Sequence, residues 1–168
     1  TMSWNARGRY ALVLASMTVL QLGLFSDLRI GGVHPDITLL VAVVSGLVAG
    51  PRRGAVIGFW AGLLIDPVLP TPLGMTALVW ATVGFAAGMA EELINSHTPL
   101  GLSLFVLGGS AGGSLMYAVV GQLFGAQTLT GNDVGRVVGL ISATNALLAL
   151  PTIAVVEWAE ESRSNITR

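Results

Sequence analysis

The sequence predicts an all-α integral membrane protein, a bundle of about six transmembrane helices with a short glycine-rich hairpin formed by the second and third spans. Three observations support this fold class. Of the 168 residues, 53% are hydrophobic and only 10% are charged, whereas soluble domains carry about 25% charged residues. The mean hydropathy is +0.77. Finally, long apolar runs alternate with charges, glycine and proline.

Six apolar runs are candidate spans, because a helix needs about 20 apolar residues to cross the hydrocarbon core. We expect one transmembrane domain over residues 1–168, with spans at about 10–28, 35–50, 51–66, 72–90, 99–124 and 134–156. The first run is too long for the core of a signal peptide, so it is expected to be a retained helix.

The second and third runs are short for a membrane span. At about 1.5 Å per residue they reach roughly 24 Å, whereas the hydrocarbon core is roughly 30 Å thick. These helices therefore thin the bilayer, extend polar ends to its interface, or form a re-entrant hairpin. The sequence leaves open whether they cross completely.

The arginines predict the orientation. All eight cationic side chains are arginine, which points to a GC-rich, bacterial genome. With six spans, one side of the membrane holds both termini and Arg7, Arg9, Arg52, Arg53, Arg163 and Arg168, and the other side holds Arg29 and Arg136. The positive-inside rule then predicts a multi-pass protein of the bacterial cytoplasmic (inner) membrane with both termini in the cytoplasm. A five-span variant with a re-entrant loop would move one terminus outside.

Glycines recur every four residues along the predicted hairpin, at Gly46, Gly50, Gly54, Gly58 and Gly62. This spacing lines one helix face, where two helices approach closely in a bilayer. Pro51, Arg52 and Arg53 interrupt the register and predict a cytoplasmic turn, so the glycines divide between the two arms. Their face either packs inside the protein or receives a partner helix.

Two carboxylates lie at the outer ends of the predicted hairpin. Asp36 follows Pro35 at the start of the second span, where a carboxylate caps free backbone amides. Asp66 precedes a proline at the end of the third span. That position is typical of a helix-stop turn, and an ion pair with Arg29 is the alternative interpretation.

Composition and spacing argue against several functions. A net charge of −1 without a basic run speaks against nucleic-acid binding, and the absence of cysteine excludes thiol catalysis and thiolate zinc sites. We expect no cofactor, metal or catalytic residue. His34, Asp36 and Asp66 lack the spacing of a metal site, and Ser110 has no histidine positioned as its base.

Residues 31–75 carry the most specific pattern. It reads Gly32-x-x-Pro35-Asp36, then Gly46-x-x-x-Gly50-Pro51-Arg52-Arg53-Gly54-x-x-x-Gly58-Phe59-x-x-Gly62-Leu63-x-x-Asp66, then Pro72-Leu73-Gly74. This pattern resembles the rod shape-determining protein MreD family in its high-GC Gram-positive form. The chain length and the six predicted spans fit the same resemblance.

The resemblance implies a non-enzymatic scaffold or adaptor of the bacterial cell-elongation machinery, the elongasome, which acts in cell shape and peptidoglycan synthesis. It implies membrane-helix contacts with an MreC-like single-span partner and, indirectly, with RodA and a penicillin-binding protein; a homo-oligomer is a further option. We expect a lipid-facing groove beside the hairpin to receive the partner helix. The alternative is the substrate-binding subunit of an energy-coupling-factor vitamin transporter, whose six-span outline is also similar.

Overall fold

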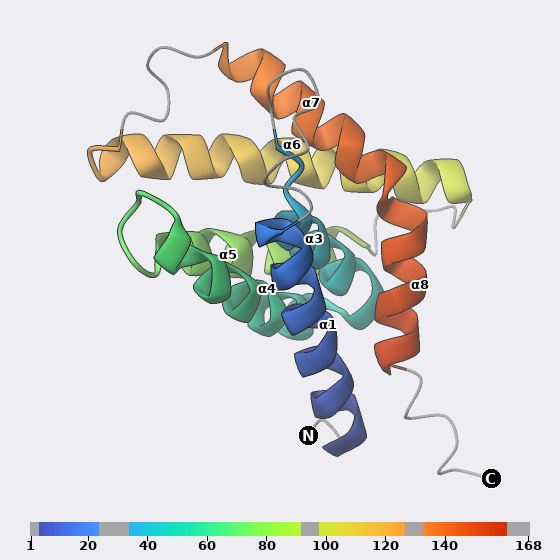
Figure 1. Ribbon diagram of the computed structural model, residues 1–168. Coiled ribbons are helices and arrows are strands. Elements are labelled where there is room, and N and C mark those ends of the chain that lie inside the picture. The colour runs from blue at the N-terminus through green and yellow to red at the C-terminus, as the bar shows by residue number, and fades with distance from the viewer. Residues whose placement is uncertain (1–3, 24–33, 92–97, 127–132, 161–168) are drawn as a thin grey trace, which may run out of the picture.

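The computed structural model describes residues 4–23, 34–91, 98–126 and 133–160. Regular structure within these ranges is entirely helical, which confirms the predicted all-α class (Figure 1). The helices are α1 (Trp4–Leu22), α3 (Ile37–Ala49), α4 (Pro51–Ile65), α5 (Met75–Glu91), α6 (Pro99–Leu123), α7 (Val134–Leu147) and α8 (Ala149–Glu160), with a short 3-10 helix, η1 (Asp66–Val68), after α4.

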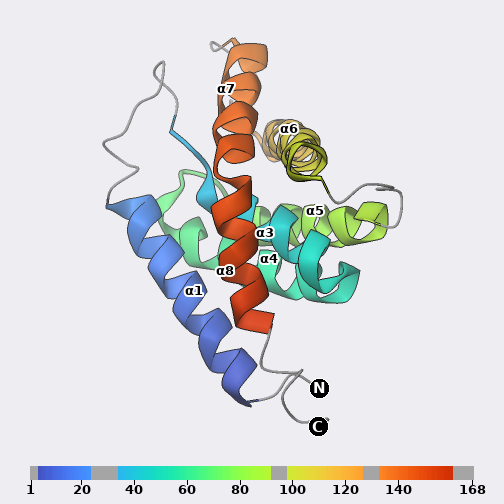
Figure 2. The same cartoon turned by 90° about the vertical axis from the view of Figure 1, so that its right-hand side faces the viewer.

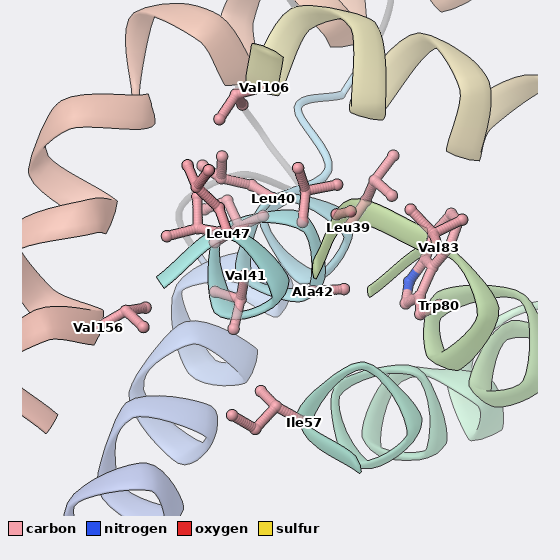
Figure 3. Close-up of a cluster of buried hydrophobic side chains, with 14 of the residues drawn as sticks. Leu39, Leu40, Val41, Ala42, Leu47, Ile57, Trp80, Val83, Val106 and Val156 are labelled. Atoms are coloured by element: carbon pink, nitrogen blue, oxygen red, sulfur yellow. The ribbon is translucent and has the colours of Figure 1, made fainter. Parts of the chain in front are cut away.

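Helix α3 is the centre of the fold. Its sequence is apolar on nearly every face, and every residue from Ile37 to Leu47 is buried. A helix of this kind is stable only when other helices surround it. Helices α1, α4, α5, α6 and α8 all contact α3. Figure 3 shows the α3 side chains pointing outward toward partners such as Val83 of α5 and Val156 of α8.

The helices do not share one axis. In Figure 1, α6 runs across the view while α1 and α8 run down it. After a turn of 90°, Figure 2 shows α6 end-on, while α1 and α8 still run from top to bottom. Helix α6 therefore crosses the direction of α1 and α8 at a steep angle, unlike the neighbouring spans of a simple aligned bundle.

The sixth predicted span, residues 134–156, is a bent pair of helices. Helix α7 ends at Leu147 and α8 begins at Ala149, with a bend of 58° between them. Proline lacks an N–H, and its ring clashes with the carbonyl four residues earlier, so Pro151 prevents a regular helical bond to Leu147. Helix α8 then continues to Glu160, past the predicted end.

Few of the described helices are long and apolar enough to cross a bilayer. Helix α6 qualifies alone, with 25 residues and a window of mean hydropathy 1.5. Helices α7 and α8 qualify only as one bent pair, and α3 and α5 are shorter apolar helices. Helix α1 begins before the predicted span 10–28, and residues 24–28 lie outside the described ranges. The described residues thus support one or two spans, and the six-span arrangement stays a prediction.

Candidate functional site

The glycines of α4 face the backbone of α5. We call Gly46 of α3 together with Gly54, Gly58 and Gly62 of α4 the covered glycine face. A Cβ atom at Gly54 would lie 2.8 Å from the carbonyl carbon of Gly84, and one at Gly62 would lie 2.5 Å from the backbone nitrogen of Ala77. Real Cβ atoms essentially never approach backbone so closely. A side chain at these positions would therefore push α4 away from α5.

Helix α5 meets this face with glycines of its own. A Cβ atom at Gly84 would lie 2.6 Å from the carbonyl carbon of Gly54, and one at Gly88 would lie 2.5 Å from the Cα atom of Pro51. A Cβ atom at Gly46 would lie 2.9 Å from the backbone nitrogen of Gly88. Backbone contact of this kind gives the dispersion energy that associates helices in lipid. Three helices of the same chain thus close the face.

Gly50 has a different role from the other four glycines. Its φ is 84°, a conformation that costs residues with a Cβ about 1 kcal/mol or more. No described atom lies within 4 Å of a Cβ built there. The turn between α3 and α4 is therefore at Gly50, while Arg52 and Arg53, predicted to lie in the turn, belong to the first turn of α4.

Arg53 is part of a polar cluster that joins three helices. Its guanidinium forms an ion pair with Glu160 of α8, and the Tyr10 hydroxyl of α1 donates to Glu160 Oε1 at 2.7 Å. Arg9 Nη1 donates to the Trp158 carbonyl at 2.8 Å, and the guanidinium stacks 4.7 Å from the centre of the Trp158 ring. The cluster fixes the Arg53 end of α4 against the two terminal helices.

Asp36 is the N-cap of α3. Its Oδ1 atom accepts hydrogen bonds from the Leu39 backbone N–H at 2.9 Å and from the Thr38 hydroxyl at 2.7 Å. The Trp80 indole N–H donates to the same Thr38 hydroxyl at 3.1 Å. The Leu39 bond satisfies one of the amides that the first turn of a helix leaves free, as the position after Pro35 suggests.

The backbone around Pro35 and Asp36 is also held by side chains from distant helices. Gln21 Nε2 of α1 donates to the Pro35 carbonyl at 3.0 Å, while Gln21 Oε1 accepts from the Ile37 N–H at 2.9 Å. Asn145 Nδ2 of α7 donates to the Asp36 carbonyl at 3.1 Å and to Ser110 Oγ of α6 at 3.0 Å. Four helices therefore meet at this point.

Asp66 connects the end of α4 to the beginning of α5. It is 1% exposed, and its carboxylate accepts from the backbone N–H groups of Gly74 at 2.8 Å, Thr76 at 3.1 Å and Ala77 at 3.4 Å. Gly74 has a φ of 89°, a value that favours glycine. Asp66 does lie at the turn after α4, as predicted, but its role as a cap of α5 was not predicted. The alternative ion pair with Arg29 is not tested, because Arg29 lies outside the described residues.

Helix α6 has a second glycine pair that faces outward. We call Leu104, Gly108, Gly112, Leu115 and Val119 the open face of α6. No described atom lies within 4 Å of a Cβ built at Gly108 or Gly112, and the leucines and valine of this face are exposed. The neighbouring Gly109 and Gly113 instead face Val43 and Leu39 of α3. The spacing of these glycines in the sequence does not by itself distinguish the two faces.

The described residues hold no group of three or more histidine, cysteine, aspartate or glutamate side chains that is able to bind a metal ion. Ser110 accepts the Asn145 amide described above and is 0% exposed. Its surroundings are those of a buried hydrogen-bonding hydroxyl that links α6 to α7.

The chain was compared with protein families, curated proteins and solved structures. The family model of the rod shape-determining protein MreD matches residues 8–153. Neither the curated proteins nor the solved structures gave a match. The family match covers most of the chain, including α3, α4, α5 and α6 in full. The chain therefore belongs to the MreD family of rod shape-determining membrane proteins.

Proposed function

We propose that the protein is a non-enzymatic scaffold of the cell-elongation machinery that binds an MreC-like single-span protein through membrane helices. The family match supports a role in rod shape determination. On this proposal RodA and a penicillin-binding protein are reached through the partner, and both termini lie in the cytoplasm. The observation that carries the docking proposal is the uncovered glycine pair on the open face of α6.

The covered glycine face is not available for a partner, because α5 of the same chain already occupies it. The partner must therefore dock elsewhere. We place its docking site on α6 and not in the predicted groove beside the hairpin. Two glycines four residues apart let a second backbone approach closely, since no side chain stands between the two helices.

Helix α6 also has the length that such a contact needs. It qualifies alone as a membrane-crossing helix, so a single-span partner runs beside it through the whole hydrocarbon core. Exposed aliphatic side chains flank the glycines, with Leu104 58% and Leu115 47% exposed. These side chains pack against the partner helix more closely than against lipid tails, and this closer packing supplies dispersion energy.

Copurification tests the docking proposal. Gly112→Leu is expected to leave the fold intact and to remove the copurifying MreC-like partner, because the new side chain separates the two backbones. Gly139→Leu on α7 is the matched control, since Gly139 is exposed and also has no described atom within 4 Å of a built Cβ. Retention of the partner by Gly112→Leu would refute docking on this face. Self-association through the face would instead appear as loss of a homodimer in the same variant.

The transporter alternative receives no support from the family match, which is to a cell-shape family. A substrate-binding subunit would copurify with its ATPase module and a soluble vitamin. Mass spectrometry of the purified protein checks both, and we expect neither to be present.

A further inference from the structure

A cavity of about 200 Å³ lies between the start of α3 and helices α5, α6 and α7. The side chains that line it are Asp36, Trp80, Ser114, Tyr117, Ala118 and, on α7, Val134, Val137, Val138 and Ile141. Its size suits a small group, since a cavity of about 150 Å³ holds one benzene molecule. Two of the lining residues, Asp36 and Tyr117, are partly exposed.

Three polar side chains at this cavity, Asp36, Ser114 and Tyr117, have unused hydrogen-bonding capacity among the described residues. Asp36 uses Oδ1 to cap α3, while its Oδ2 accepts no hydrogen bond from a described residue. The Ser114 hydroxyl is buried and has no partner among the described residues. Among the described residues, the Tyr117 hydroxyl has one long contact, of 3.4 Å, with the Thr71 hydroxyl. An ionised carboxylate only accepts hydrogen bonds, so an occupant that bonds to Asp36 Oδ2 must bring an N–H or O–H group.

The other side chains that line the cavity favour an occupant with a positive charge and a short apolar part. Trp80 and Tyr117 pack with their ring centres 5.6 Å apart, and aromatic rings attract cations. Valine and isoleucine side chains of α7 form the opposite wall. No described cationic side chain forms an ion pair with Asp36, and ionisable groups in a membrane protein usually have a partner or a function.

We propose that this cavity binds an organic ammonium group on a short aliphatic chain, with Asp36 Oδ2 and the Ser114 hydroxyl accepting its N–H bonds. The two sources of this chemistry are the ethanolamine headgroup of a membrane lipid and a free soluble amine. The site is independent of the docking surface on α6, because Ser114 and Tyr117 belong to a different face of that helix from Gly112.

Asp36→Asn separates the ligand role of Asp36 from its capping role. Asparagine caps helices about as well as aspartate, so the variant keeps the Leu39 bond and loses the negative charge. Asp133→Asn is the matched control, because Asp133 is the N-cap of α7, accepts from the Arg136 N–H and does not line the cavity. Ala118→Leu keeps Asp36 but fills the cavity.

The test uses the full chain in two kinds of nanodisc. In phosphatidylglycerol nanodiscs, calorimetry measures binding of ethanolammonium, with neutral ethylene glycol as the comparison probe. In nanodiscs that mix phosphatidylethanolamine with phosphatidylglycerol, native mass spectrometry measures which lipid stays bound. Binding in the first arm identifies a free amine, and selective retention of phosphatidylethanolamine in the second identifies a lipid headgroup.

We expect binding in at least one arm to fall about tenfold or more in Asp36→Asn and in Ala118→Leu, a loss of about 1.4 kcal/mol or more. Asp133→Asn should bind as the unchanged chain does. Absence of ammonium binding in both arms, or equal binding by the unchanged chain and Asp36→Asn, would overturn the proposal. If Asp36→Asn does not fold, equal binding by Ala118→Leu overturns it.

Discussion

Gly54 and Gly58 on α4, and Gly108 and Gly112 on α6, have the same spacing but opposite surroundings. A Cβ atom built at Gly58 would lie 2.7 Å from the carbonyl carbon of Trp80, whereas one built at Gly112 would meet no described atom within 4 Å. The spacing alone shows where a backbone is able to approach closely. The surroundings of each glycine pair show whether a helix of the same chain already covers it or whether it is open to a helix of another protein.

The two glycine regions therefore have different roles. The covered glycine face holds α3, α4 and α5 together, so changes there should act on folding. The open face of α6 has no such internal role among the described residues, so changes there should act on association. Substitutions in the two regions should therefore differ in which of these two properties they change.

Gly58→Leu should have the largest effect, because the new side chain overlaps the α5 backbone rather than a movable side chain. Overpacking of ordinary cores costs about 1–3 kcal/mol, and a clash with backbone costs more. We expect a loss of monodisperse protein after detergent extraction. Phe59→Leu is the control, since Phe59 is exposed on the same helix. A normal yield and melting temperature for Gly58→Leu would contradict the role of the covered glycine face.

Asp66→Ala should come next, because it removes the acceptor of three backbone N–H groups at the start of α5. Leaving buried donors without partners costs about 1–3 kcal/mol for each group, so we expect a loss of about 3 kcal/mol in unfolding free energy. Unfolding in mixed detergent micelles measures it. Asp66→Asn keeps one acceptor oxygen and should lose less. Equal stability of both variants and the unchanged chain would show that the cap is dispensable.

Glu160→Gln should have a small effect. The amide oxygen still accepts from the Tyr10 hydroxyl, and only the ion pair with Arg53 is lost. Both side chains are partly exposed, at 23% and 18%, and such pairs contribute about 1 kcal/mol or less. Unfolding at low and high salt measures the loss, which should shrink as salt rises. The exposed Glu157→Gln serves as the control, and a salt-independent loss would argue against an electrostatic role.

The local features of this fold were predictable from the sequence. The α3 to α4 break was predicted beside Pro51, and it lies at Gly50 because glycine adopts a positive φ without strain. The Asp36 cap was predictable because a helix cap depends on residues that are only three positions apart in the sequence. The glycine spacing similarly indicated a helix face that a second backbone contacts.

The missed features depend on residues that are far apart in the sequence. Glycine spacing does not say that α5 is the helix that covers α4, because Gly84 and Gly88 have the same spacing as several other pairs. Asp66 caps a helix that begins nine residues later, after an intervening turn. Polar side chains such as Gln21 and Asn145 inside apolar runs are expected to hydrogen-bond between helices, but their partners at the start of α3 were not predictable, because these bonds form only once α1 and α7 are in place.

One measurement tests the division between the two glycine regions most directly: the unfolding free energy and the partner copurification of Gly112→Leu, measured on the same preparation. We predict stability within about 0.5 kcal/mol of the unchanged chain, as for surface substitutions, together with loss of the MreC-like partner. A variant that unfolds, or one that folds and still retains the partner as Gly139→Leu does, would contradict the assignment of the open face of α6 to association.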